Sequence, residues 1–371
     1  MIMLRKKLRI AQLGSIWETT PPKLYGGTER VVSNLTEGLV KQGHEVTLFA
    51  TGDSKTKAKL VSITPKALYR HGVSWGNFIY PLLHIYNAYE MSENFDLIHV
   101  HLNMISDFTA AAMSKLLKIP SVFTIHFKLP DKNEPPQNRY LAFKNFSDIN
   151  YVSISNSQRT IKSLNYASTV YNGIDFSIYK FDETGGDSLC WIGRFTPDKG
   201  PESAIKVSKK INKKILLAGK IDLNDKRDQA FYRAEIESYL KSNPRQYNYI
   251  GEINDKQKST FFPKARCLLN PINWREPFGL VVIEANACGT PVVAFDQGAM
   301  REIIKDGVNG FVVKAGDIQT MTKRVEEIYN MPDKEYREFR RSAREYAEKN
   351  FSSEKMVANY EKLYYKILSN K

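Results

Sequence analysis

Residues 8–50 read LRIAQLGSIWETTPPKLYGGTERVVSNLTEGLVKQGHEVTLFA, and this stretch decides the fold. Its apolar beginning, Leu8–Leu13, is typical of a buried strand. Apolar residues then recur at helical spacing after Thr28, the predicted N-cap, until Gly43 ends the helix. Glu45–Ala50 has the pattern of a second strand. A strand, a helix and a strand in this order predict two parallel, neighbouring strands.

The same alternation continues along the chain and then starts a second time. The further strands that the pattern predicts are Leu97–Val100, Ser121–Ile125, Tyr151–Ile154, Leu189–Ile192, Lys214–Ala218, Tyr247–Gly251, Cys267–Pro271, Pro291–Phe295 and Phe311–Val313. Two such series predict an α/β protein with two doubly wound parallel-sheet domains, residues 1–175 and 176–352. Since ligands bind at the carboxyl ends of such strands, we expect a cleft between the two domains.

Composition excludes several classes of protein. The 371 residues are 42% hydrophobic and 25% charged, which excludes a disordered chain. Three cysteines (Cys190, Cys267, Cys288) are too few for a disulfide scaffold and form no zinc pattern, which favours a reducing cytoplasm. The sequence contains no run of about 18 apolar residues, so no transmembrane helix is predicted. Met1–Leu13 resembles a first strand rather than a signal peptide.

The net charge of +14 is divided equally between residues 1–175 and residues 176–371. Such an excess favours anionic ligands: nucleotides, phosphorylated acceptors or a membrane surface. A lysine-rich proteome explains it equally well. No nucleic-acid motif accompanies the charge, so we expect no nucleic acid as a partner.

The densest group of chemically useful residues is Arg275–Glu284, REPFGLVVIE. Pro277 suits the first turn of a helix predicted over Phe278–Cys288, whose free N–H groups suit phosphate. Gly279 allows close approach of a ligand to the backbone. Glu276 is placed to accept bonds from sugar hydroxyls, and Glu284, about two turns into the helix, to bind a ribose diol. A helix cap and a solvated helix position are the structural alternatives for these two glutamates.

Two further groups follow predicted strands or begin a predicted helix. Arg194 and Lys199 come after Leu189–Ile192 and offer cations for phosphate oxygens, with a solvated surface turn as the alternative. Gly26 and Gly27 precede a predicted helix, where backbone can approach a phosphate or a sugar. A flexible turn is the alternative there.

Three histidines lie on neighbouring predicted strands. His126 ends a strand at the expected cleft, which makes it the best candidate to touch a substrate. His99 and His101 flank Val100 and therefore share one face, but a third metal ligand is lacking. We assign His99 a structural role. No P-loop is present, which argues against a P-loop ATPase. No Asp-x-Asp motif is present either, and no metal site is predicted.

With these residues, the chain resembles the retaining glycosyltransferases of family 4 (glycosyl transferases group 1), which have the GT-B fold. The most specific motif is the Glu-x7-Glu of Glu276 and Glu284. The other motifs are Gly-Gly-Thr-Glu-Arg (26–30), His-Val-His (99–101), Thr-Ile-His (124–126), Tyr-Asn-Gly-Ile-Asp (171–175), Gly-Arg-Phe-Thr-Pro-Asp-Lys-Gly (193–200) and the segment 298–310. The one departure, Ala299 where many members have a second glycine, is expected to matter little.

The resemblance implies a role for each candidate residue. Arg194 and Lys199 would hold the diphosphate of a UDP- or GDP-sugar. Glu276, with backbone N–H groups around Phe278, Gly279 and Leu280, would hold the transferred sugar, and Glu284 the ribose. His126 would lie near the donor sugar, and Gly26-Gly27 near phosphate and acceptor. The resemblance also implies no cofactor or catalytic metal, and a last helix (353–371) that returns to the first domain.

The biological setting is open at this point. The resemblance favours synthesis of a glycan, a glycolipid or a cell-envelope polysaccharide, in the cytoplasm or at the inner face of the membrane. The acceptor is a sugar, a lipid-linked molecule or a small molecule. A nucleotide-sugar epimerase of the same fold and a non-catalytic nucleotide- or carbohydrate-binding protein are the alternatives.

Overall fold

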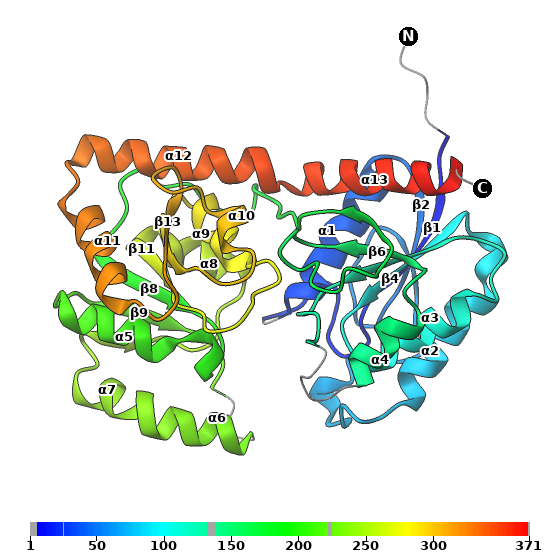
Figure 1. Cartoon of the computed structure of the whole chain (residues 1–371), viewed down its shortest axis with the longest axis horizontal. Coiled ribbons are helices and arrows are strands. Elements are labelled where there is room, and N and C mark those ends of the chain that lie inside the picture. The colour runs from blue at the N-terminus through cyan, green and yellow to red at the C-terminus, as the bar shows by residue number, and fades with distance from the viewer. Residues whose placement is uncertain (1–5, 25, 132–137, 222–224, 370–371) are drawn as a thin grey trace, which may run out of the picture. The chain divides into compact units, whose positions relative to one another are not determined.

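The computed structural model describes residues 6–24, 26–131, 138–221 and 225–369. The chain divides into two compact units: unit 1 comprises Met1–Gly173 and Ser353–Lys371, and unit 2 comprises Ile174–Ser352. The division falls two residues before the boundary placed after Asp175. The C-terminal helix α13 (Ser353–Ser369) belongs to unit 1, where it packs against α1 (Gly27–Lys41; Figure 1).

Unit 1 is built on a parallel sheet of seven strands in the order β3-β2-β1-β4-β5-β6-β7. The strands are β1 (Arg9–Leu13), β2 (Glu45–Phe49), β3 (Lys59–Val61), β4 (Leu97–Leu102), β5 (Ser121–Ile125), β6 (Asn150–Ser153) and β7 (Tyr166–Thr169). Besides α1 and α13, its helices are α2 (Ile79–Glu90), α3 (Phe108–Ser114) and α4 (Asn138–Asn145).

Unit 2 is built on a parallel sheet of six strands in the order β10-β9-β8-β11-β12-β13. The strands are β8 (Ser188–Ile192), β9 (Ile215–Ala218), β10 (Tyr247–Tyr249), β11 (Ala265–Asn270), β12 (Val292–Phe295) and β13 (Gly310–Val313). The helices are α5 (Pro201–Lys210), α6 (Lys226–Phe231), α7 (Glu237–Ser242), α8 (Asp255–Phe261), α9 (Leu280–Ala287), α10 (Met300–Ile303), α11 (Ile318–Asn330) and α12 (Asp333–Phe351). Two doubly wound parallel-sheet domains are thus confirmed.

The strand order places a switch point in each sheet. In unit 1 the chain runs outward in one direction from β1 and in the other from β4. In unit 2 the neighbouring pair with this property is β8 and β11. Ligands of open α/β sheets bind outside the carboxyl ends of such a pair. The segments that follow β1, β4, β8 and β11 are therefore where a site is expected.

Two predicted helix starts are wrong. The N-cap of α1 is Gly26, with φ of 151°, and not Thr28. Helix α9 begins at Leu280 after Gly279, so Pro277 lies outside it and not in its first turn. In both cases a glycine with positive φ turns the chain into the helix. This conformation costs glycine little and most other residues more, and a capping rule based on side-chain oxygens misses it.

The elements that the sequence analysis did not predict include β3, β7, α2, α4 and α10. Strand β3 has three residues at the edge of the sheet, too few for an alternating pattern. Helix α2 carries apolar residues on both its buried and its exposed side, which hides the helical period. Among the helices of the described ranges, none combines the length and the apolarity that a bilayer crossing requires.

Candidate active site

A lysine, a glutamate and a tryptophan meet at the carboxyl edge of the unit 2 sheet. Lys199 ends a short turn after β8, and Glu276 lies in the loop between β11 and α9. Lys199 Nζ donates to Glu276 Oε2 at 2.7 Å, and Trp274 Nε1 donates to the same oxygen at 3.0 Å. The ammonium nitrogen also lies 4.6 Å from the Trp274 ring centroid. A charged contact thus joins the two segments that flank the switch point.

Two glycines allow the loops of this cluster to approach one another. Gly200 has φ of 65°, and a Cβ there would collide with the carbonyl oxygen of Pro271. Gly298 has φ of 58°, and a Cβ there would collide with the backbone of Glu276. The carbonyl oxygen of Glu276 accepts a bond from the Ala299 N–H at 3.0 Å. Gly298 and Ala299 therefore fix the backbone that presents the Glu276 carboxylate.

Arg194 lies in the same loop as Lys199. Its Nε is buried and has no hydrogen-bond partner among the described residues, and the same is true of the Thr196 hydroxyl. Buried polar atoms are almost always paired, so an unpaired one next to a sheet edge suits a missing ligand. A guanidinium nitrogen calls for an anionic or carbonyl acceptor.

The start of α9 contributes backbone rather than side chains. The Phe278 side chain is buried, and its ring centroid lies 5.8 Å from that of Phe351. Gly279 has φ of 108°, and a Cβ there would lie 2.8 Å from Met300 Cε. Leu280 is the first helical residue. The first N–H groups of a helix have no partner within it and, together with the helix dipole, favour an anion.

Glu284 is not the solvated helix residue that the sequence allowed as an alternative. Its side chain is 2% exposed. Lys258 Nζ donates to both of its carboxylate oxygens at 2.8 Å, and the Tyr179 hydroxyl donates to Oε1 at 3.0 Å. These bonds leave about one of the roughly four lone-pair sites of a carboxylate for a ligand.

Lys258 and Tyr179 were not identified from the sequence. Lys258 lies three residues before Phe261 on the buried face of α8, and a lysine at an apolar helical position is the signal that could have found it. Nothing in the sequence near Tyr179 indicates its contact with a glutamate more than a hundred residues away.

In unit 1, Gly26 and Gly27 form the turn into α1. A Cβ at Gly26 would lie 2.6 Å from Pro22 Cβ. The buried Arg30 holds this turn, because its guanidinium donates to the carbonyl oxygens of Gly26 and Leu24 at 3.2 Å each. The arginine of the Gly-Gly-Thr-Glu-Arg motif is thus used internally. These two bonds connect Arg30 with the chain that leads into α1.

His99, His101 and His126 belong to one buried network of unit 1. Its links are His126 Nε2 to His101 Nδ1 (2.9 Å), His101 Nε2 to Gln12 Oε1 (2.8 Å), Gln12 Nε2 to Tyr364 Oη (3.1 Å), Tyr364 Oη to His99 Nδ1 (2.7 Å), His99 Nε2 to Thr124 Oγ1 (2.7 Å) and Thr124 Oγ1 to Tyr360 Oη (2.9 Å). The network connects His126, at the end of β5, with α13. His99 is fully buried, in agreement with the structural role assigned to it. Gln12, Tyr360 and Tyr364 had not been singled out.

The network fixes which nitrogen of His126 carries the proton. The Gln12 oxygen can only accept, so His101 carries its proton on Nε2. His101 Nδ1 is then an acceptor, and His126 must donate from Nε2. Burial lowers the pKa of His99 and His101 well below the ordinary range and that of His126 to about 3, so all three rings are neutral. His126 therefore presents an unprotonated Nδ1, a hydrogen-bond acceptor.

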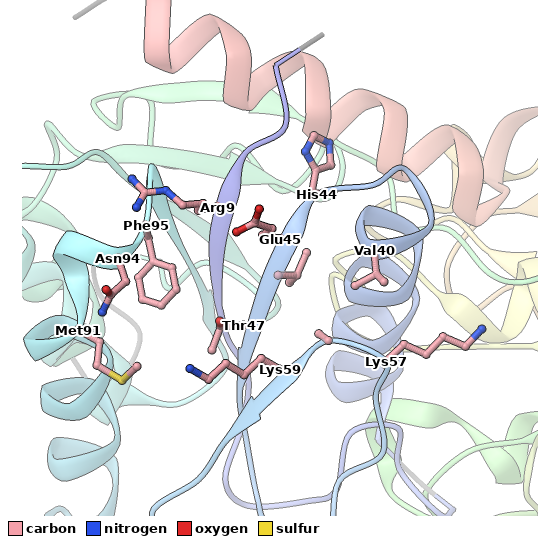
Figure 2. A pocket seen from close by; sticks show the side chains of 12 residues that line it. Arg9, Val40, His44, Glu45, Thr47, Lys57, Lys59, Met91, Asn94 and Phe95 are labelled. Carbon is pink, nitrogen blue, oxygen red and sulfur yellow. The ribbon is translucent and has the colours of Figure 1, made fainter. Parts of the chain in front are cut away.

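A hollow of unit 1 lies elsewhere. It has a volume of about 500 Å³ and is lined by Arg9, His44 and Glu45, at the amino ends of β1 and β2, together with residues such as Lys59 and Met91 (Figure 2). This is the edge opposite to the switch point, so we assign no site there. Within the described ranges, no group of three or more His, Cys, Asp or Glu side chains is placed to hold a metal ion.

The candidate residues thus form two sets. Arg194, Lys199, Glu276, Glu284 and the segment 278–280 lie in unit 2. His126, Gly26 and Gly27 lie in unit 1. Within unit 2 the Lys199–Glu276 contact is direct, whereas Glu284 contacts Lys258 and Tyr179 instead.

Comparison with known proteins shows which family models this chain matches. Residues 180–350 match the family model described as glycosyl transferases group 1, and residues 25–177 match that of glycosyltransferase family 4. The N-acetyl-alpha-D-glucosaminyl L-malate synthase of Bacillus anthracis is 26% identical over 376 residues, which cover 92% of this chain and 94% of that protein.

Two solved structures show the same fold. The sucrose-phosphate synthase of Thermosynechococcus elongatus has a TM-score of 0.81 at 18% identity and covers 98% of this chain and 100% of its own. The HepE protein of Anabaena, solved in complex with UDP-glucose, has a TM-score of 0.74 at 18% identity, with the same coverage. The two family models together span most of the sequence, and the chain belongs to the family 4 glycosyltransferases, which have the GT-B fold.

Proposed function

We propose that this protein is a retaining glycosyltransferase that moves a sugar from a nucleoside diphosphate donor to an acceptor hydroxyl, without a catalytic metal. The observation that carries the proposal is the contact between Lys199 and Glu276 at the switch point of unit 2. It places a cation for phosphate and a carboxylate for sugar hydroxyls at the edge where α/β sheets bind their ligands.

In this proposal the donor diphosphate takes the place that the unpaired Arg194 Nε leaves open. The Lys199 ammonium and the first N–H groups of α9 add positive potential to the same site. Negative charge grows on the diphosphate as it leaves, and preorganised donors stabilise it more than they stabilise the bound donor. This difference is what accelerates the transfer.

The bond changes follow from retention of configuration. The bond between the anomeric carbon and the phosphate oxygen breaks, and the acceptor oxygen forms its bond on the same face of the sugar. The acceptor proton passes to the leaving phosphate oxygen. Two carboxylates are therefore not required as acid and nucleophile, in contrast to a retaining glycosidase.

The remaining candidates recognise the donor. Glu276 accepts bonds from hydroxyls of the transferred sugar when Lys199 turns to the phosphate. Glu284 has about one acceptor site left and contacts the ribose through it. The unprotonated Nδ1 of His126 accepts a bond from a sugar hydroxyl, and the Gly26-Gly27 turn approaches phosphate and acceptor.

We propose UDP-sugars as the first donors to test and GDP-sugars as the second. The UDP-glucose bound by HepE of Anabaena, a structure of the same fold, motivates this order. The acceptor we propose is a hydroxyl of a sugar, a lipid-linked molecule or a small molecule, in the synthesis of a glycan, a glycolipid or a cell-envelope polysaccharide.

The test is a donor panel. Purified protein is incubated with UDP-, GDP-, ADP-, dTDP- and CMP-sugars in the presence of EDTA, and thermal shift and nucleotide release are measured. A donor at about 100 times its dissociation constant adds roughly 2.7 kcal/mol of stability, which such a shift detects. One responding nucleotide, with product of unchanged anomeric configuration once an acceptor is found, supports the proposal.

Other outcomes would contradict it. Donor isomerisation without an acceptor would identify a nucleotide-sugar epimerase. Binding of a donor without turnover with any acceptor would identify a binding protein. If EDTA abolished the activity and a divalent cation restored it, the proposal that the transfer needs no catalytic metal would be wrong.

A further inference from the structure

Trp274 contacts both members of the Lys199–Glu276 pair. Its indole N–H donates to Glu276 Oε2 at 3.0 Å, and the Lys199 ammonium lies 4.6 Å from its ring centroid. Lys199 Nζ donates to the same Glu276 oxygen at 2.7 Å. The edge of one side chain thus binds the anion of the pair, and its face binds the cation.

Tryptophan is suited to this double contact. The indole nitrogen donates a hydrogen bond and accepts none, so it cannot replace Glu276 as the acceptor for Lys199. The face of the ring carries the negative part of its quadrupole, which attracts an ammonium group. A phenylalanine at this position would keep the face and lose the donor.

The loop that carries Trp274 is joined to the turn that carries Lys199. The Asn273 N–H donates to the carbonyl oxygen of Asp198 at 2.8 Å. Nε1 of Trp191, a residue of β8, donates to the Lys199 carbonyl oxygen at 3.1 Å. Because hydrogen bonds hold both backbones, movement at this contact is left to the side chains.

The two contacts leave one Glu276 oxygen for a ligand. Lys199 and Trp274 both bind Oε2, and in the described part of the chain Oε1 accepts no hydrogen bond. The Lys199 and Glu276 side chains are each 17% exposed, so a ligand can reach them. When Lys199 turns to the donor diphosphate, Oε2 loses its cation and keeps the indole N–H. This remaining bond fixes the direction in which Oε1 faces.

We propose that Trp274 is a positioning residue for the transferred sugar. Its N–H holds Oε2 of Glu276 and so aims Oε1 at the sugar hydroxyls, while its ring holds the Lys199 ammonium until a diphosphate binds. The inference rests on the proposed function, since it needs Glu276 to bind the sugar and Lys199 to bind the diphosphate. A carboxylate that is already oriented binds hydroxyls without the entropy cost of ordering a free side chain.

The contact itself is tested without a donor. The chain has four tryptophans, so the signal that is missing from the indole ¹⁵N–¹H spectrum of Trp274→Phe belongs to Trp274. Glu276→Ala removes the acceptor of this N–H and should shift the signal in the free protein. An unchanged signal would overturn the proposal.

The role in the transfer is tested with Trp274→Phe, which keeps a ring and removes the N–H. We expect kcat/KM for the donor that responds in the panel to fall about tenfold. The dissociation constant of the free nucleoside diphosphate should change less than about twofold, because the diphosphate does not need Glu276. A merely structural defect would weaken both, and thermal unfolding checks that the variant folds.

Trp274→Leu removes the ring as well as the N–H. The Lys199 ammonium then loses its contact with the ring face and must be ordered when the diphosphate binds. We expect this variant to weaken binding of the nucleoside diphosphate by about threefold or more, in addition to the loss in kcat/KM. Recovery of the diphosphate affinity in Trp274→Phe would assign this second effect to the ring.

Two further comparisons isolate the path through Glu276. When Trp274→Phe is added to Glu276→Ala, it should cost little further activity, because the indole acts through that carboxylate. Trp75→Phe replaces an exposed tryptophan of unit 1 and is the matched control. It should leave both kcat/KM and the dissociation constant unchanged.

The outcomes distinguish this inference from the function on which it rests. If the unmodified chain bound and used no nucleotide-sugar, the proposed function would be wrong, and this role with it. If the unmodified chain transferred sugar and Trp274→Phe did so with the same kcat/KM, only the role of Trp274 would be wrong. A full effect of Trp274→Phe in the Glu276→Ala background would also overturn it, because the indole would then act elsewhere.

Discussion

The polar contacts described in the two units differ in kind: those of unit 1 are neutral and those of unit 2 are charged. In unit 1 the histidine network joins neutral rings, an amide and hydroxyls. In unit 2 the contacts join full charges, Lys199 to Glu276 and Lys258 to Glu284. All six histidines of the chain lie between residues 44 and 126, and unit 2 has none. One fold therefore supports two different electrostatic environments, and side chains, not the fold, decide which ligand fits.

Acidification should destabilise unit 1 more than unit 2. We expect this difference in stability to be larger than the effect of any single substitution. The folded state keeps His84, His99, His101 and His126 neutral, with the pKa of His84 lowered to about 4 and that of His126 to about 3. The unfolded chain binds protons at these residues below about pH 6.5. Their stabilisation is therefore present above pH 6.5 and is lost as the pH falls, by about 1.4 kcal/mol per pH unit for each histidine.

Peptide-resolved hydrogen exchange, pulse-labelled at one fixed pH after equilibration in urea at pH 7.0 and at pH 5.5, measures the two units separately. Peptides of unit 1 should lose protection at lower urea concentrations at pH 5.5, whereas those of unit 2 should change much less. Equal loss in both units would show that the comparison does not hold.

Removal of Lys258 should be the most destabilising change in unit 2. The variant Lys258→Met leaves the buried Glu284 carboxylate without its cation, and breaking such a pair costs about 3–5 kcal/mol. Urea unfolding measures the loss. Lys256→Met, an exposed lysine on the same helix, is the control and should stay within about 0.5 kcal/mol.

A double variant distinguishes charge from packing at this position. Lys258→Met/Glu284→Gln removes both charges and should recover most of the stability that Lys258→Met loses. If the double variant were as unstable as the single one, the lysine would act through packing of its side chain.

Lys199→Ala should reduce activity with little effect on stability. Loss of one preorganised donor to the leaving group costs about 10²–10³ in kcat, while the pair with Glu276 is partly exposed and contributes little to folding. Steady-state kinetics and thermal unfolding measure the two effects. Lys213→Ala, which removes a surface pair with Asp187, is the control. Normal turnover by Lys199→Ala would show that Lys199 has no role in the mechanism.

Tyr364→Phe should have the smallest effect of the four. It leaves Gln12 Nε2 and His99 Nδ1 without a partner, which costs about 1–3 kcal/mol. Because the orientation of Gln12 sets the His101 proton, the tautomer of His126 should also become mixed, as ¹⁵N chemical shifts of the ring nitrogens report. Tyr365→Phe, whose hydroxyl bonds the Lys6 carbonyl at the surface, is the control. If the His126 tautomer were unchanged, the proton position on His126 would not depend on Tyr364 of α13.

Local patterns were sufficient for much of the fold. Glycines that end helices, apolar residues at helical spacing and apolar runs together predicted the strands at the centres of both sheets. They therefore also predicted the carboxyl ends of these strands, after which Lys199, Glu276 and His126 lie. The pattern was insufficient for β3, which is too short, and for α2, whose exposed face is apolar. Backbone conformation also overrode side-chain rules at Gly26 and Gly279.

The sequence by itself determined two parallel α/β sheets and the residue types available at their carboxyl ends, because both depend on periods of a few residues. Only the tertiary structure decided the partners of those residues. Lys258 meets Glu284 across 26 positions, and Tyr364 meets His99 across 265. Such contacts depend on strand order and on which helix face packs inward. They decide which charges are neutralised, which proton is fixed and which donor is left for a ligand.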